Sequence, residues 1–463
     1  MSNPERWLRL LALMLLLLAV FSGCSDGDDD DDQTGADDDD DADDDSASGD
    51  DDDNDDTDCP DADEDGFTDA ACGGEDCDDH DPLSHPDAAE LCTDGRDQDC
   101  DGVEDDGCVY FDVETVLDDY LPNEDRRFYS LAYLSDGTPV VAYYAPGPKA
   151  LGVSVRTAKG WPTRIVDEQG DTGWYASVDV DGADRIGVAY HNATAGDLKV
   201  AFKTTAEDWT ARTVASQGMT GLNAKLHFGL NDEANVFCMK KYADWYIAHY
   251  EEAGAAWNEW QRFGNAFVQI SYTFDAHMAP SGFPVFSWPD YNYEMSSDKY
   301  GYDAMYAGWY DPLGGDNSVV LYWGHLIDVD MRFTAVTWDE DNQPMSFFIT
   351  DAVPVIVVGE FTNSWGIYDL PDNHVAPAAP LSADTASDGT VYLAYTNALS
   401  NTPRIAYRTN GVLWRFADVF DGDQFGSGAQ LTVAPDDLPG VVFLDHTQGA
   451  LRYAKMKIIP EVD

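Results

Sequence analysis

Two segments of the chain share a twelve-residue pattern in which aspartates alternate around a glycine and a cysteine closes the pattern; the copies span 61–72 and 97–108. Alternating carboxylates supply the oxygen ligands that a hard divalent cation requires, and the glycine lets the chain turn sharply around the ion. The pattern predicts two calcium-binding loops. Their candidate ligands are Asp61, Asp63, Asp65, Asp69, Asp97, Asp99, Asp101 and Asp105.

Cysteine occupies the twelfth position, where an EF-hand loop carries a bidentate glutamate. These loops are therefore not EF-hands, and their remaining ligands must come from elsewhere in the chain. The alternative interpretation is an acidic, disulfide-bonded loop that needs no metal.

The segment between the two loops is also rich in carboxylates, and it adds the candidate ligands Asp76, Asp78, Asp79 and Asp81. Residues 76–108 resemble the MopE-type metal-binding repeat of bacterial surface proteins, and the loop at 61–72 resembles the forerunner that usually precedes that repeat. The resemblance implies an extracellular metal-binding module that is appended to varied partners. It covers about fifty residues of the chain and implies nothing about the remainder.

The family label mentions copper, and His80 and His85 could supply imidazole ligands to Cu(II). Carboxylates outnumber these histidines severalfold, and no methionine lies in the module. Calcium is therefore the expected cofactor, with copper kept as the alternative and the two histidines interpreted as exposed loop residues.

Six cysteines fall within about fifty residues, which predicts three disulfide bonds in an exported protein. Their pairing stays open; they are Cys59, Cys72, Cys77, Cys92, Cys100 and Cys108. A segment this small and polar cannot bury a sufficient hydrophobic core. We therefore expect disulfides and metal to stabilise a module at 59–108. Cys238 stands alone in an apolar strand and is expected to be a buried thiol.

The N-terminus reads as an export signal: Arg6 and Arg9 precede an apolar run at 10–20, and Cys24 follows a small-residue cleavage site. It resembles a bacterial lipoprotein signal, which implies a signal peptide at 1–23 and lipidation of Cys24, with plain secretion as the alternative. Aspartate then fills 21 of the 33 positions from 26 to 58. Such a composition predicts that 24–58 is a disordered tether.

The chain carries 89 acidic and 25 basic residues. Nucleic acid is excluded as a partner, because neutralising phosphates requires clusters of Lys and Arg that are missing here.

A short apolar strand that ends in an aromatic residue recurs from residue 109 onward, at spacings of 47, 47, 49, 61, 48 and 48 residues. The recurring aromatics are Tyr143, Tyr190, Phe237, Phe286, Phe347, Tyr395 and Phe443. Four strands per repeat of this length are typical of a β-propeller blade, so the fold class predicted for 109–463 is an all-β, seven-bladed β-propeller. The last repeat lacks a fourth strand, which the segment 110–117 is expected to supply.

The repeat with the long spacing contains an aromatic insertion, interpreted as a recognition loop for a glycan or a protein. Its candidates are Trp288, Tyr291, Tyr293, Tyr300 and Tyr302, and Trp174 is expected at the channel mouth. The sequence contains none of the catalytic motifs HExxH, GxSxG or a phosphate-binding loop. We therefore expect a binding protein at the bacterial outer membrane or cell surface rather than an enzyme, with a polysaccharide-active enzyme and a copper-binding surface protein as alternatives.

Overall fold

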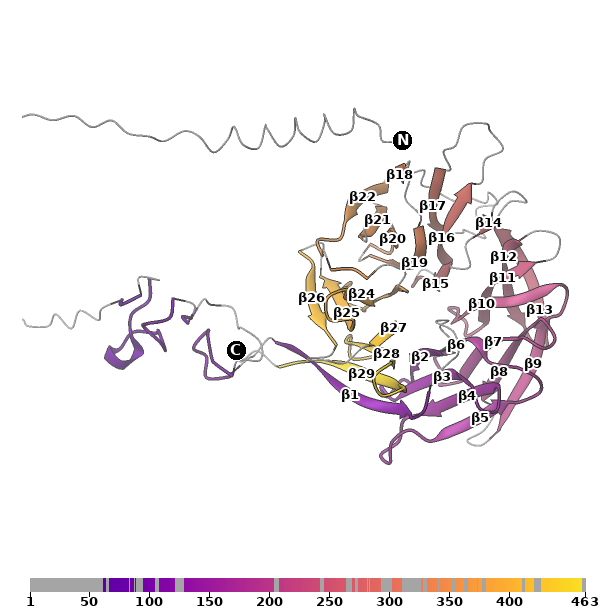
Figure 1. Cartoon of the computed structure of the whole chain (residues 1–463), viewed down its shortest axis with the longest axis horizontal. Helices are drawn as coiled ribbons and strands as arrows, with labels where there is room; N and C mark the ends of the chain where they lie inside the picture. Colours follow the sequence, from indigo (N-terminus) through magenta and orange to yellow (C-terminus); the bar gives the residue numbers. More distant parts are fainter. Residues whose placement is uncertain are drawn as a thin grey trace, which may run out of the picture. The chain divides into compact units, whose positions relative to one another are not determined.

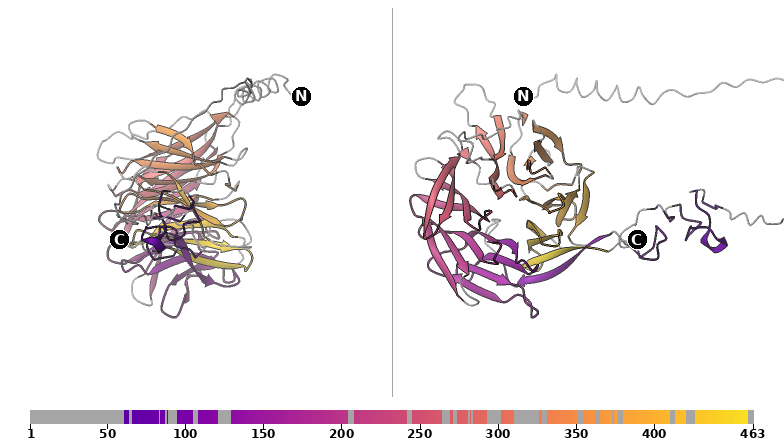
Figure 2. Two further views of the ribbon diagram at one scale, coloured as in Figure 1. Left: turned by 90° about the vertical axis from the view of Figure 1, so that its left-hand side faces the viewer. Right: turned by 180° about the vertical axis from the view of Figure 1, so that it is seen from behind.

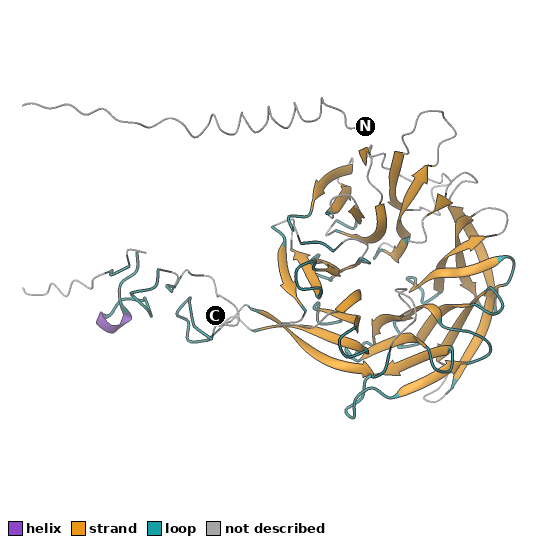
Figure 3. Cartoon of the chain, in the orientation of Figure 1, coloured by secondary structure: helices purple, strands orange, loops and turns teal. Residues whose placement is uncertain are grey.

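The computed structural model of the chain consists of β-strands, turns and one short 3-10 helix, η1 (Ala70–Cys72) (Figure 3). It describes residues 61–459 except 64–65, 83, 87, 89–94, 105–107, 121–128, 204–207, 242–244, 264–268, 271–273, 281, 283, 293–301, 310–325, 328–330, 340, 351–354, 362–364, 373, 377–379, 410–412 and 420–425. Across the residues described, no helix is both long and apolar enough to cross a membrane.

The strands form antiparallel sheets arranged around a common axis (Figures 1 and 2). The first blade contains β2 (Tyr129–Tyr133), β3 (Pro139–Ala145), β4 (Ala150–Val155) and β5 (Thr163–Asp167). The second contains β6 (Trp174–Val180), β7 (Ile186–Asn192), β8 (Asp197–Lys203) and β9 (Trp209–Ala215). The third contains β10 (Met219–Phe228), β11 (Ala234–Lys241), β12 (Trp245–Ala253) and β13 (Ala256–Phe263).

Three more four-stranded blades follow later in the chain. One contains β19 (Met331–Trp338), β20 (Pro344–Thr350), β21 (Ile356–Phe361) and β22 (Trp365–Asp369). The next contains β23 (Ser382–Thr385), β24 (Val391–Thr396), β25 (Pro403–Arg408) and β26 (Arg415–Asp418). The closing blade combines β27 (Gly426–Val433), β28 (Pro439–Asp445) and β29 (Ala450–Ile458) with β1 (Val109–Leu117).

The prediction of a seven-bladed propeller is wrong, because six of the sheets formed by the described residues are four-stranded blades. The remaining sheet has five strands: β14 (Gln269–Ile270), β15 (Asp275–Met278), β16 (Pro284–Asn292), β17 (Tyr302–Trp309) and β18 (Leu326–Ile327). Both β14 and β15 pair with β16, so the position of one inner strand is divided between two short strands. The spacing of 61 residues between Phe286 and Phe347 also falls in this part of the chain, although β14 and β15 both precede Phe286.

Closure by the N-terminal strand is confirmed. Strand β1 pairs antiparallel with β29, from Val109 opposite Ile458 to Leu117 opposite Leu451, and becomes the outermost strand of the closing blade (Figure 1). Its neighbour Cys108 accepts a backbone hydrogen bond from Ile459 N at 3.0 Å. The two ends of the propeller are therefore held together by main-chain hydrogen bonds, and the closing blade has all four strands.

The recurring aromatic is buried in every repeat. All seven predicted residues, from Tyr143 to Phe443, are at most 1% exposed. Burying a side chain of this size contributes roughly 1.5–3 kcal/mol of hydrophobic free energy. The repeat read from the sequence is thus the packing repeat of the structure.

Two blades add a polar lock around this aromatic. The Tyr190 hydroxyl donates to Asp167 Oδ2 at 2.6 Å, and Lys199 forms an ion pair with the same carboxylate. Tyr395, Asp372 and Arg404 repeat the arrangement two hundred residues later along the chain. Each tyrosine thereby connects its own blade to an aspartate at or just after the outermost strand of the preceding blade.

Candidate metal centre and propeller surface

A hydrogen bond to the side chain of its first aspartate closes the first aspartate loop. The amide of Gly66 donates to Asp61 Oδ2 at 3.0 Å, and Gly66 has a φ of 105°. This left-handed conformation is accessible to glycine at little steric cost. The hydrogen bond folds the loop back onto its first carboxylate.

The second loop repeats this geometry. Gly102 N donates to Asp97 Oδ2 at 2.8 Å, and Gly102 has a φ of 94°. One carboxylate oxygen from each of Asp97, Asp99 and Asp101 lies within 4.8 Å of the others. The loop therefore gathers three of its predicted ligands around one point.

Two aspartates of the following segment close around the first loop. Asp79 Oδ1 accepts a hydrogen bond from Ala62 N at 3.0 Å, at the start of the loop. Asp76 lies against its end: Asp76 N donates to Thr68 O at 3.0 Å, and Asp76 O accepts from Ala70 N at 2.7 Å. Asp76 and Asp79 therefore lie against the loop whose pattern lacks a twelfth ligand.

Burial at this first loop leaves carboxylate oxygens without partners. Asp76 is 0% exposed, and its Oδ1 accepts a hydrogen bond from Asp78 N at 2.8 Å. Its Oδ2, like Oδ1 of Asp61, is buried and has no hydrogen-bond partner among the described residues. A buried carboxylate oxygen is strongly destabilising unless a charge or a donor compensates it. A bound cation fits this requirement.

At the second loop, electrostatic repulsion between carboxylates also favours a bound cation. Two unit charges 4.8 Å apart, the upper limit for the separations in this cluster, repel by about 1 kcal/mol in bulk water and by about 3.5 kcal/mol at an effective dielectric constant near 20. Three carboxylates form three such pairs, so their total repulsion is about three times as large or more. A divalent cation replaces the repulsion by attraction, so both loops are chemically suited to calcium.

The two segments are covalently joined by a disulfide bond between Cys77 and Cys100. Cys72 and Cys108 are also disulfide-bonded, whereas Cys59, Cys92 and the predicted lipidation site Cys24 lie outside the described residues. The grouping of Asp76, Cys77 and Cys100 is no thiolate site, because the sulfurs are already bonded to each other. As predicted, Cys238 is a buried free thiol.

Other predicted ligands are placed differently. The carboxylate of Asp69 caps η1 by accepting a hydrogen bond from Ala71 N, Asp78 is exposed, and Asp81 pairs with Arg96 at 2.8 Å. Asp65 and Asp105 lie outside the described residues. The histidines are not brought into either carboxylate cluster: His80 is exposed, and His85 stacks on Phe67 with ring centroids 5.0 Å apart.

The structure describes the two ends of the aromatic insertion, which belong to β16 and β17. Trp288 lies within β16, is 5% exposed and stacks on Phe286, so its selection as a ligand-binding residue is wrong. Tyr291 and Tyr302 also belong to strands, because β16 and β17 continue pairing as far as Asn292 and Tyr302. Tyr293 and Tyr300 lie outside the described residues, so their role in recognition stays a prediction.

Trp174 is the first residue of inner strand β6, and its place at the channel mouth stays a prediction. Its indole nitrogen donates to Asp171 Oδ1 at 2.8 Å, and its ring meets that of Tyr144 edge-on at 6.2 Å. Burial raises the pKa of Tyr144 to about 12, with Asp171 contributing in the same direction. These three side chains form a partly exposed aromatic and acidic group at the start of the inner strand.

Sequence comparison supports the metal assignment for part of the chain. Residues 76–106 match the Cu-binding MopE family, which is described as a putative metal-binding motif. No curated protein matches the chain.

Several solved structures are distantly similar at 10–11% identity. The polysaccharide lyase Uly1 has a TM-score of 0.48 and covers 71% of this chain and 89% of its own. A protein of unknown function from Dyadobacter fermentans has a TM-score of 0.43, over 75% and 99%. A Trypanosoma rangeli sialidase has a TM-score of 0.41, over 71% and 60%. Likenesses this distant carry no information about what the present chain binds.

Proposed function

We propose that this protein is a calcium-binding protein of the bacterial cell surface whose propeller binds an extracellular glycan or protein. The observation that carries the calcium assignment is at the first loop, where Asp76 and Asp79 pack against the loop backbone. One oxygen of Asp61 and one of Asp76 are buried there and lack partners among the described residues. Asp97, Asp99 and Asp101 provide the second site. Hard oxygen ligands of this kind suit calcium better than copper.

Calcium in this module has a structural role. The ions would hold the two aspartate loops in their turned conformations, while the Cys77–Cys100 bond fixes the segments to each other. Extracellular calcium modules usually have dissociation constants of about 10⁻⁴–10⁻³ M. Sites of that affinity remain occupied at the calcium concentrations found outside cells.

Elemental analysis and calcium titration of the oxidised chain from Cys59 to Asp463 test this function. About two calcium ions per chain are expected, with a loss of one when Asp99 is replaced by Ala. Copper in place of calcium, reduced by His80→Ala and His85→Ala, would support the copper-binding alternative. A chain without either metal would refute the calcium function and leave an acidic disulfide-bonded spacer.

The export and anchoring part of the proposal rests on the sequence of residues 1–58. Growth of the producing cells with a labelled fatty acid should label the protein, and Cys24→Ala should abolish that label. A labelled Cys24→Ala variant would refute lipidation at this position. Release of reducing ends from extracellular polysaccharide by the purified protein would support the enzyme alternative over a binding role.

A further inference from the structure

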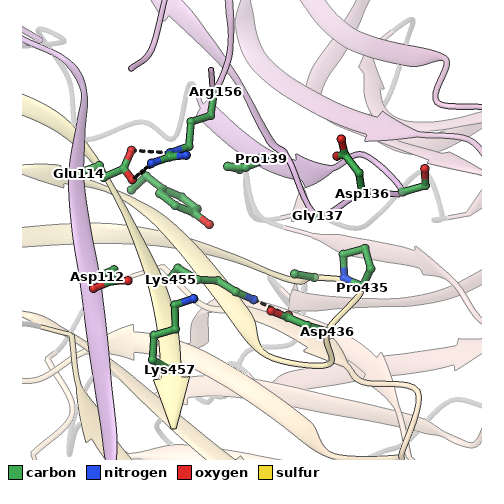
Figure 4. Close-up of a pocket in the computed structure, with 13 residues that line it drawn as sticks. Asp112, Glu114, Asp136, Gly137, Pro139, Arg156, Pro435, Asp436, Lys455 and Lys457 are labelled. Carbon is green, nitrogen blue, oxygen red and sulfur yellow. Dashed lines mark hydrogen bonds and ion pairs between the residues drawn. The ribbon is translucent and has the colours of Figure 1, made fainter. Parts of the chain in front are cut away.

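A cleft of about 480 Å³ opens between the closing blade and the first blade (Figure 4). Strands β1 and β29 form one wall, and the β2–β3 turn with Arg156, directly after β4, forms the other. The hydroxyls of Tyr133 and Tyr453 meet at 3.0 Å and join the two blades beside it. Its volume lies within the range of about 300–1,000 Å³ that is usual for small-molecule sites.

The lining of the cleft is unusual for so acidic a chain, because it contains three cations. Arg156 is bound by Glu114 at 2.7 Å, and Lys455 by Asp436 at 2.6 Å. Lys457 lies two residues further along β29, and its ammonium group has no ion-pair or hydrogen-bond partner among the residues that the structure describes. It is the one basic group of the lining that is free to bind a ligand anion.

Repulsion between the two lysines favours an anionic ligand. Burial lowers the pKa of Lys455 and the positive charge of Lys457 lowers it further, whereas the Asp436 carboxylate opposes both effects. Figure 4 shows both ammonium groups extending from β29 into the same cleft. A ligand carboxylate near Lys457 would relieve this repulsion and pair with a charge that the protein leaves unmatched.

Four carboxylates in the same lining limit how much negative charge a ligand can bring. They are Asp112, Glu114, Asp136 and Asp436. A sulfated or phosphorylated polyanion would be repelled by them, and a neutral ligand would leave Lys457 unmatched. Asp112 and Asp136 are exposed, and carboxylate oxygens accept hydrogen bonds from hydroxyl groups. A ligand with one carboxylate and several hydroxyls satisfies both kinds of group.

We propose that this cleft binds a saccharide that carries one carboxylate per sugar, a uronic-acid glycan. Lys457 pairs with the carboxylate, and Asp112 and Asp136 accept hydrogen bonds from ring hydroxyls. The cleft lies beside the β2–β3 turn, at the end of an inner strand, whereas Trp174 is the first residue of inner strand β6 and does not line the cleft. The two sites are therefore separate. This inference rests on the binding role proposed for the propeller and names a ligand class for it.

Calorimetric titration of the oxidised chain in calcium tests the inference. The probes are disaccharides of galacturonate, glucuronate and mannuronate, each compared with its carboxyl-reduced, neutral counterpart. At least one acidic disaccharide should bind more tightly than its neutral form. Lys457→Gln should weaken that binding about tenfold or more, because it removes a charged hydrogen-bond donor. Lys203→Gln, a matched change on β8 of another blade, should leave it unchanged.

The inference is overturned if no acidic disaccharide binds, if the neutral forms bind equally well, or if Lys457→Gln binds like the original chain. An unchanged urea midpoint in Lys457→Gln excludes a general loss of folding. Trp174→Ala distinguishes failure of the cleft as the binding site from failure of the binding role proposed for the whole propeller. Binding that is lost in Trp174→Ala but kept in Lys457→Gln would preserve the propeller's binding role and refute the cleft.

Discussion

Replacing Asp76 by Asn should have opposite effects on the module with and without calcium. Asn has nearly the shape of Asp, and its oxygen can keep the hydrogen bond from Asp78 N that Oδ1 now accepts at 2.8 Å. What changes is the buried Oδ2, which has no hydrogen-bond partner among the described residues. The substitution therefore removes one buried negative charge and little else.

Without calcium, Asp76→Asn should stabilise the first loop by about 1–2 kcal/mol. An unpaired buried charge costs several kcal/mol, whereas an amide that lacks one partner costs about 1–3 kcal/mol. With calcium the same change removes a ligand charge, and we expect about tenfold weaker binding. At 3 mM calcium, a rise in dissociation constant from about 0.3 to about 3 mM lowers the stabilisation from about 1.4 to about 0.4 kcal/mol.

Calcium titration by calorimetry gives the affinity, and hydrogen exchange of the peptide 61–79 with and without chelator gives the local stability. Asp78→Asn is the matched control, because Asp78 is the exposed neighbour of the buried residue. Equal losses of affinity in the two variants, or a first loop that exchanges faster in calcium-free Asp76→Asn, would refute the reasoning.

Three other predictions follow from individual contacts. Gly102→Ala should weaken calcium binding at the second loop, because a φ of 94° strains alanine by roughly 1–2 kcal/mol although nothing lies within 4 Å of the added Cβ; a normal titration would contradict this. Tyr190→Phe should lower the free energy of unfolding by about 1–3 kcal/mol in urea, since it removes the donor to buried Asp167; an unchanged midpoint would show that the lock contributes no stability. Burial lowers the pKa of His249 to about 4, below its unfolded value near 6.5, so its stability contribution is complete above pH 6.5 and is lost as the pH falls towards 4. That loss amounts to about 3 kcal/mol, and unfolding measured between pH 7 and 4 should depend less on pH in His249→Gln.

The repeat was predictable because it expresses packing that each blade must satisfy separately. An aromatic that is buried seven times leaves seven copies of one signal, and the missing fourth strand identified β1 as the closing strand. The irregular sheet was not predictable from this signal. The 61-residue spacing revealed an insertion, but its effect depended on whether β16 and β17 kept pairing, and pairing through Asn292 and Tyr302 buried Trp288 instead of exposing it.

The aspartate loops were predictable for a different reason, since their candidate ligands lie close together in sequence. The pattern located Asp97, Asp99 and Asp101 and required additional ligands for the first loop. It could not distinguish Asp76, which is fully buried, from Asp78, which is exposed, because both belong to one run of acidic residues. Only the fold, which pairs Asp76 with Thr68 and Ala70, separates them.

The cleft illustrates what a sequence pattern omits altogether. Glu114 and Arg156 are 42 residues apart, and Lys455 lies another three hundred residues along the chain. The closing strand brings them together, because β1 places Glu114 opposite Tyr453 and Asp112 opposite Lys455. The strand that completes the ring therefore also builds one wall of the site. Since β1 follows the metal module directly in sequence, a change that unpairs β1 from β29 should abolish uronate binding while leaving calcium binding to the module intact.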